Sequence, residues 1–178
     1  MKEESLLLLS DLQKLINQVV LIDYTIIILG GKFVFGLFVI RSDLTIHISP
    51  QALLEYDTTR DGKVIIFTGS KITGGFCVTT YSLLSISKLK HILEDCPALR
   101  DCLLSEGEFI QYKGRKYAWL DIDKNGVIKL PHSTLAVLDL QSGMELLAIR
   151  SSDIAFTMGA KGPLLQKAHN FQGSIEQY

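Results

Sequence analysis

The chain has 178 residues, of which 47% are hydrophobic, so it can bury a sizeable core. Its 18 basic and 19 acidic residues give a formal net charge of -1, which excludes a general attraction to phosphate and leaves nucleic acid only a local basic surface. The three cysteines, Cys77, Cys96 and Cys102, form no CxxC pair, and this pattern favours reduced thiols and a cytoplasmic location.

The N-terminal part has two apolar stretches with different patterns. Apolar residues at helical spacing predict an amphipathic first helix: Leu8, Leu12, Leu15, Ile16 and Val19. Asp11 interrupts this stretch, so we expect no secretory signal peptide. The second stretch, residues 24–40, has Lys32 beside two glycines at its centre and many β-branched and aromatic residues. It predicts a buried β-hairpin rather than a membrane-spanning helix.

The middle and the C-terminal part predict the same succession of elements twice. The first copy has Pro50, then a short helix and a strand joined by an Asp-Gly turn, at residues 51–56 and 63–68. The second copy has Pro131, then a short helix and a strand joined by a Ser-Gly turn, at residues 132–138 and 144–149. An internal repeat of one strand-helix-strand unit would explain this order.

Identical residues at matching positions support the repeat. At one offset they are Pro50 with Pro131, Leu54 with Leu135 and Gly62 with Gly143, and after a slip of one residue Ser70 with Ser152, Ile72 with Ile154 and Leu83 with Leu165. Ordinary composition would give roughly two such matches. We therefore expect the two copies to pack against each other.

The segment between the copies is predicted to be helical from 85 to 105, with a break at Pro97. Its second piece, 98–104, has only Arg100 as a basic residue, which favours a linking helical pair over a helix-turn-helix. We therefore divide the chain at 1–105, with the N-terminal helix, the first unit and the linking helices, and 106–178, with the second unit and a C-terminal helix. We expect the tail from 170 to 178 to be loose.

The second copy also carries a recognisable pattern. It runs Asp-Ile-Asp-Lys-Asn-Gly-Val-Ile-Lys-Leu-Pro from Asp121 to Pro131, then Leu-Asp-Leu at 138–140, Gly143, and Leu-Leu-Ala-Ile-Arg at 146–150. This order resembles the AbrB/SpoVT swapped-hairpin family, in which a strand, Leu-Pro, a short helix, a glycine and a strand follow one another. The continuation from 150 to 168 is similar to a subgroup in which the unit runs on into a C-terminal helix. The first copy resembles the family mainly through Pro50, Gly62 and residues 68–70.

The resemblance implies a fold and a function. The expected fold class is α+β and β-rich, with two AbrB-like units forming an interleaved small β-barrel and added helices. The expected function is transcription regulation through DNA binding by paired β-hairpin units. The two copies would close each other's strand edges within one chain, as a pseudo-dimer, or pair with another chain in a homo-oligomer.

The candidate DNA-binding residues are not those typical of the family. The family's arginine after the glycine of the first strand is replaced here by Val127, and the short helix is apolar at 134–138. The cations that remain are Lys113, Arg115, Lys116, Lys124 and Lys129. The first three lie in a predicted basic hairpin beside Tyr112, Tyr117 and Trp119, whose rings could stack on bases. The alternative is an exposed turn whose lysines keep an edge strand soluble.

Two other functions stay open at this point. One is a protein-interaction or scaffold module that keeps the swapped core without DNA contact, as Val127 and the near-neutral charge suggest. The other is a small-ligand domain, if the interlocked units enclose a cavity.

Other motifs have simpler explanations. Asp121-x-Asp123-x-Asn125-Gly126 imitates a calcium loop, but the twelfth position is His132 instead of glutamate, so we expect a turn. The glycines near Ser70 lack the spacing of a phosphate-binding loop. Since no nucleophile and base are grouped and the four histidines are scattered, we expect no enzymatic activity, metal or cofactor, and no membrane partner.

Overall fold

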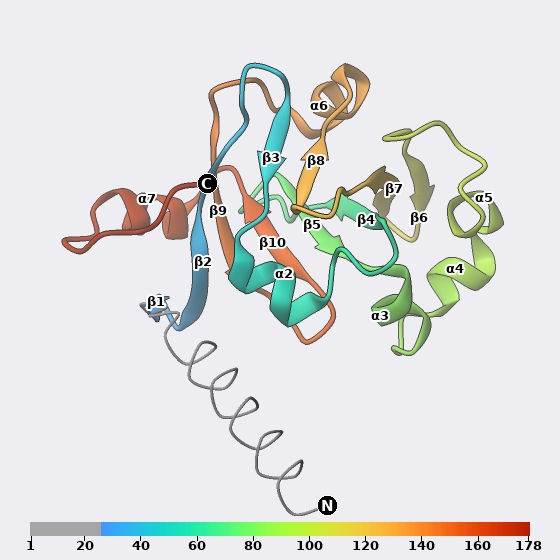
Figure 1. The fold of residues 1–178 in the computed structure, drawn as a ribbon, viewed down its shortest axis with the longest axis horizontal. Coiled ribbons are helices and arrows are strands. Elements are labelled where there is room, and N and C mark those ends of the chain that lie inside the picture. Colours follow the sequence, from blue (N-terminus) through green and yellow to red (C-terminus); the bar gives the residue numbers. More distant parts are fainter. Residues whose placement is uncertain (1–25) are drawn as a thin grey trace, which may run out of the picture.

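The computed structural model describes residues 26–178, so the predicted N-terminal helix lies outside the described residues. Within them the chain is α+β and strand-rich, as predicted, with an eight-stranded antiparallel sheet, a two-stranded sheet and six helices (Figure 1). The strand order of these residues does not form a closed barrel. None of the helices described is both long enough and apolar enough to cross a membrane.

The elements fall into two runs with two short helices between them. The first run is β1 (Ile27–Leu29), β2 (Lys32–Val39), β3 (Thr45–His47), α2 (Pro50–Tyr56), β4 (Lys63–Thr68), β5 (Phe76–Thr79) and α3 (Tyr81–Ser85). The connecting helices are α4 (His91–Asp95) and α5 (Pro97–Arg100). The second run is β6 (Ile110–Tyr112), β7 (Arg115–Asp121), β8 (Val127–Lys129), α6 (His132–Leu138), β9 (Glu145–Arg150), β10 (Phe156–Gly159) and α7 (Pro163–His169).

The two runs repeat the same order of elements, a hairpin, a short strand, a helix, two strands and a helix. The starts of β3 and β8, of α2 and α6, and of β4 and β9 are each 82 residues apart, from 45 to 127, from 50 to 132 and from 63 to 145. The predicted match of Pro50 with Pro131 is therefore wrong by one residue. Pro50 is the first residue of α2, whereas Pro131 precedes α6 as its N-cap. The predicted match of Leu54 with Leu135 fails in the same way, because Leu54 is 75% exposed and Leu135 only 5%.

The two units exchange strands. The order of the large sheet is β1-β2-β9-β10-β5-β4-β7-β6, so β2 of the first unit pairs with β9 of the second, and β7 of the second pairs with β4 of the first. The registers correspond, with Leu37 opposite Leu147 in one pair and Trp119 opposite Ile65 in the other. The first strand of each unit thus closes an edge that the other unit would leave open.

An approximate twofold axis relates the units. The central strands β5 and β10 pair with Cys77 opposite Thr157, and the small sheet pairs β3 with β8, with Ile46 opposite Ile128. Each of these pairs joins equivalent positions of the two units, so the axis passes through both pairs. A division of the sequence at 105 therefore does not divide the core, since the sheet mixes strands from both segments.

The main core lies between one face of the large sheet and a layer made of β3, β8, α2 and α6 (Figure 1). Its largest fully buried side chains include Phe38, Tyr56, Phe76 and Phe156. The opposite face of the sheet carries two smaller clusters, one under α7 at the β1 end and one under α3, α4 and α5 at the β6 end. The middle of this face, over β5 and β10, belongs to neither cluster.

Two local predictions are confirmed and one is confirmed only in part. The hairpin predicted within 24–40 is present as β1 and β2, with Leu29 opposite Lys32. The basic hairpin is present as β6 and β7, with Tyr112 opposite Arg115. In the segment 85–105 the break at Pro97 is confirmed, but Ser85 is the last residue of α3, and residues 86–90 form turns before α4 begins.

The prediction of a loose C-terminal tail is wrong. The N–H of Leu37 donates to the carbonyl oxygen of Glu176 at 2.9 Å, and the N–H of Tyr178 donates to the carbonyl oxygen of Leu37 at 2.9 Å. The ring of Tyr178 also stacks on Phe38, with 5.2 Å between the centroids. The pairing of β2 with β9 has a register shift between Val34 and Gly36, and the tail uses the backbone groups of β2 at this irregularity.

The contact between the central strands can be tested at Gly75, which precedes β5. Its φ is +59°, and a Cβ there would lie 2.0 Å from the carbonyl oxygen of Met158 in β10. Gly62, with φ +65°, is the matched control because a Cβ there would meet nothing within 4 Å. We expect Gly62→Ala to lower the free energy of unfolding by about 1 kcal/mol and Gly75→Ala by about 3 kcal/mol or more, measured by urea denaturation. Equal losses would show that β5 and β10 are not in this close contact.

Candidate nucleic-acid interface

The two-stranded sheet of β3 and β8 presents one face to solvent. Alternation along the strands buries Ile46 and Ile128 in the main core. The outward side chains, here called the ribbon face, are Thr45, His47, Val127 and Lys129. Lys129 is the single lysine or arginine of this face, and Val127 is half-buried at the position where the family resemblance would place an arginine.

The turn from β7 into β8 exposes Lys124. The Oδ1 atom of Asp123 accepts the backbone N–H groups of Asn125 at 2.8 Å and of Val127 at 2.9 Å. The aspartate of the calcium-like sequence therefore stabilises a turn, as predicted. Among residues 26–178 no group of three or more His, Cys, Asp or Glu side chains is placed to hold a metal ion.

The loop from β2 into β3 adds charges of both signs. Arg41 is exposed there and was missed in the sequence, where no motif distinguishes it from other surface arginines. The hydroxyl of Thr45 donates to Oδ1 of Asp43 at 2.6 Å, and this bond lowers the pKa of the Asp43 carboxyl below its ordinary value. Asp43 is therefore ionised at neutral pH and lies in the same surface hollow as Lys129. The cations at this end of the molecule are partly offset by a neighbouring carboxylate.

The structure does not bring the five predicted cations into one group. Lys124 and Lys129 belong to the ribbon and its turn, whereas Lys113, Arg115 and Lys116 belong to the β6–β7 hairpin at the edge of the large sheet. The strand β7 separates the groups, because it begins at Arg115 and ends at Asp121, before Lys124. Seven residues of strand span roughly 20 Å.

The cations of the hairpin also point in different directions. The Nη1 atom of Arg115 donates to the carbonyl oxygen of Thr68 at 2.8 Å, and its guanidinium lies 5.5 Å from the ring centroid of Phe67. Lys116, the next residue of β7, lines a separate hollow beside α6. The Nζ atom of Lys113 lies 5.2 Å from the ring centroid of Tyr112. Arg115 thus faces the second side of the sheet.

The predicted stacking platform is not free for bases. Tyr117 is 7% exposed and belongs to the cluster under α3 to α5. The Nε1–H of Trp119 donates to the carbonyl oxygen of Leu104 at 3.0 Å, and the Nζ atom of Lys63 lies 4.2 Å from the centre of the Trp119 ring. The hydroxyl of Tyr112 donates to Oδ2 of Asp95 at 2.5 Å. All three rings are therefore engaged within the protein.

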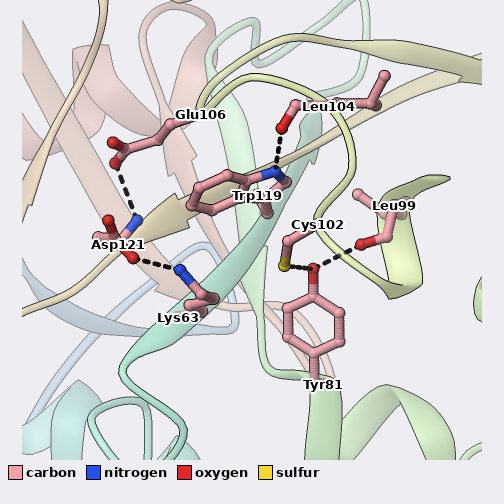
Figure 2. A network of polar contacts seen from close by, with 8 residues as sticks. All are labelled: Lys63, Tyr81, Leu99, Cys102, Leu104, Glu106, Trp119 and Asp121. Atoms are coloured by element: carbon pink, nitrogen blue, oxygen red, sulfur yellow. Dashed lines mark hydrogen bonds and ion pairs between the residues drawn. The ribbon is translucent and has the colours of Figure 1, made fainter.

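Figure 2 shows what Trp119 and its neighbours do instead. The Nζ atom of Lys63 lies 2.6 Å from Oδ1 of Asp121, and this bond raises the pKa of Lys63 above its ordinary value. The backbone N–H of Asp121 donates to Oε1 of Glu106 at 2.9 Å. On the other side, the hydroxyl of Tyr81 donates to the carbonyl oxygen of Leu99 at 2.7 Å. These bonds attach the segment that connects the two units to β4, β7 and α3.

Comparison with known proteins adds no relative: no protein-family model and no curated protein matches the chain. The resemblance to AbrB/SpoVT proteins therefore depends on the residues quoted above, and its functional meaning is treated as a proposal below.

The structural role of Trp119 can be tested by Trp119→Phe. The variant keeps an aromatic ring but leaves the carbonyl oxygen of Leu104 without its donor. We expect the free energy of unfolding to fall by about 1–2 kcal/mol, as measured by urea denaturation. Lys63→Gln is the control in the same network, and its effect should be smaller because exposed ion pairs contribute little. An unchanged stability of Trp119→Phe would contradict this role.

Proposed function

We propose that the protein is a DNA-binding regulator of the AbrB/SpoVT type in which one chain supplies both swapped units. The observation that supports this most is the reciprocal pairing of β2 with β9 and of β7 with β4, with β3 and β8 paired across the same axis. In the family that the sequence resembles, two units complete each other's small barrel. The proposal includes an interleaved, barrel-like core of this kind, built within a single chain.

The DNA-binding surface in this proposal is the ribbon face with the turns at its ends. Arg41 lies in the loop before β3, and Lys124 lies in the equivalent turn before β8. Because the two turns are related by the approximate twofold axis, their cations lie on opposite sides of it, as contacts to the phosphates of two half-sites require. Lys129 lies between them on the ribbon face. Lys113 and Lys116 are on a different edge and are assigned no base contact.

A gel-shift titration at several salt concentrations tests this surface. Genomic fragments should be shifted by the protein at roughly 50 mM salt, and Lys124→Ala/Lys129→Ala should weaken binding and reduce the slope of log affinity against log salt by about 2, because two phosphate contacts are lost. The control is Lys71→Ala/Lys88→Ala, which removes the same charge from exposed positions outside the ribbon. Equal effects of the two double variants, or no shift by the wild-type protein, would rule out the proposed surface.

A second candidate is an interaction module that keeps the swapped core without binding DNA. It is favoured by Val127 on the ribbon face and by the ionised Asp43 beside Lys129. The variant Val127→Arg distinguishes the two functions. If the wild-type protein binds DNA through this face, the added arginine should raise the affinity and the salt slope by about 1. A wild-type protein that does not bind, together with a Val127→Arg variant that does, would identify a core that lost its DNA contact.

A further inference from the structure

A cleft crosses the middle of the second face of the large sheet, between the two smaller clusters. It consists of two adjoining hollows with volumes of about 310 and 260 Å³. Both hollows are lined by Phe67, Leu89, Arg115 and Ile154, so they form one continuous depression. Its size is at the lower end of the range for small-molecule sites.

The smaller hollow lies on the approximate twofold axis. Its lining includes three equivalent pairs from the two units, namely Phe67 with Ile149, Ser70 with Ser152 and Cys77 with Thr157. The last pair is the central pair of β5 and β10, and its Sγ and Oγ1 atoms are 3.3 Å apart. The hollow is therefore produced by the duplication itself, at the place where neither smaller cluster covers the sheet.

The charge of the cleft is one-sided. Arg115 lines both hollows, and neither lining contains an aspartate or a glutamate. Within the described residues, Arg115 donates one hydrogen bond, to the carbonyl of Thr68, and has no carboxylate within ion-pair distance. A guanidinium has five N–H donors, so most of them remain for a ligand. Burial raises the pKa of the Cys77 thiol, which therefore adds no negative charge at neutral pH.

The two hollows offer complementary chemistry on either side of Arg115. The smaller one is rich in hydroxyl groups, contributed by Ser70, Thr73, Ser151, Ser152 and Thr157. The larger one is walled by apolar and aromatic side chains of Phe67, Leu84, Leu89, Ile92 and Tyr117, with Lys113 as a second cation. A ligand would thus place an acidic group among hydroxyls and a guanidinium, and an apolar body against the aromatic wall.

We propose that this cleft binds a small organic anion, with a carboxylate or phosphate group held by Arg115 and the neighbouring hydroxyls and an apolar body in the larger hollow. Guanidinium groups pair with both acids through parallel charge-assisted hydrogen bonds, so the two chemistries share one recognition group. The cleft lies on the opposite face of the sheet from the ribbon, and the proposal does not depend on DNA binding.

A fluorescence titration with anilinonaphthalene sulfonate, an aromatic anion, tests the proposal on the full chain. We expect saturable binding of one probe molecule per chain, and displacement by phenyl phosphate or benzoate but not by phenol. Arg115→Gln should weaken binding about tenfold, since it removes a charged donor. Lys116→Gln is the matched control, because it removes the same charge from the neighbouring residue, which lines a different hollow. The relative potency of phenyl phosphate and benzoate tells which acid group the site prefers.

Two results would overturn the proposal. One is equal binding by Arg115→Gln and Lys116→Gln, after thermal melting has shown that both variants are folded. The other is displacement of the probe by phenol as readily as by phenyl phosphate. Amide chemical shifts give a measurement that needs no variant: phenyl phosphate should perturb the loops between β4 and β5 and between β9 and β10 and the start of β7, and changes confined to other regions would also reject the site.

Discussion

The exchange of strands between the two units is the constraint on which the rest of the structure depends. Alone, each unit would leave the backbone groups of its outer strands unpaired, and exposed strand edges are open to aggregation. The pairing of β2 with β9 and of β7 with β4 removes these edges with equivalent registers on the two sides. It also brings Phe76 and Phe156, from the two central strands, into one core beneath β3 and β8.

The exchange also gives the two faces of the sheet different characters. On one face, the β3–β8 ribbon with α2 and α6 covers a continuous apolar core. On the other, coverage comes from α7 at one end and from α3 to α5 at the other, and the polar pair Cys77 and Thr157 lies between them. The two proposals follow this difference, because the ribbon is a convex surface with cations at its turns and the cleft is a concave one with an arginine and hydroxyls.

The local elements were largely predictable, and the candidate site was predictable only in part. The strand at 63–68 and the helix at 132–138 are found with the bounds read from the sequence, because apolar periodicity and turn residues act over a few positions. The five cations were correctly named as surface charges, yet nothing local indicates that Arg115 and Lys116 point to opposite sides of the sheet or that β7 separates them from Lys124. The roles of Tyr117 and Trp119 were not predictable, since a buried ring and a stacking ring have the same sequence pattern.

The sequence by itself determined that the chain is α+β, that one unit occurs twice, and where most short helices and strands begin and end. Only the tertiary structure decided which strands pair, that the repeat runs at 82 residues instead of the offset that matched the prolines, and that the tail lies along β2. The physical reason is the range of the interactions. A strand of apolar residues such as β2 fits many edges equally well, and its pairing with β9, which joins residues 37 and 147, is selected by the simultaneous closure of all the other edges.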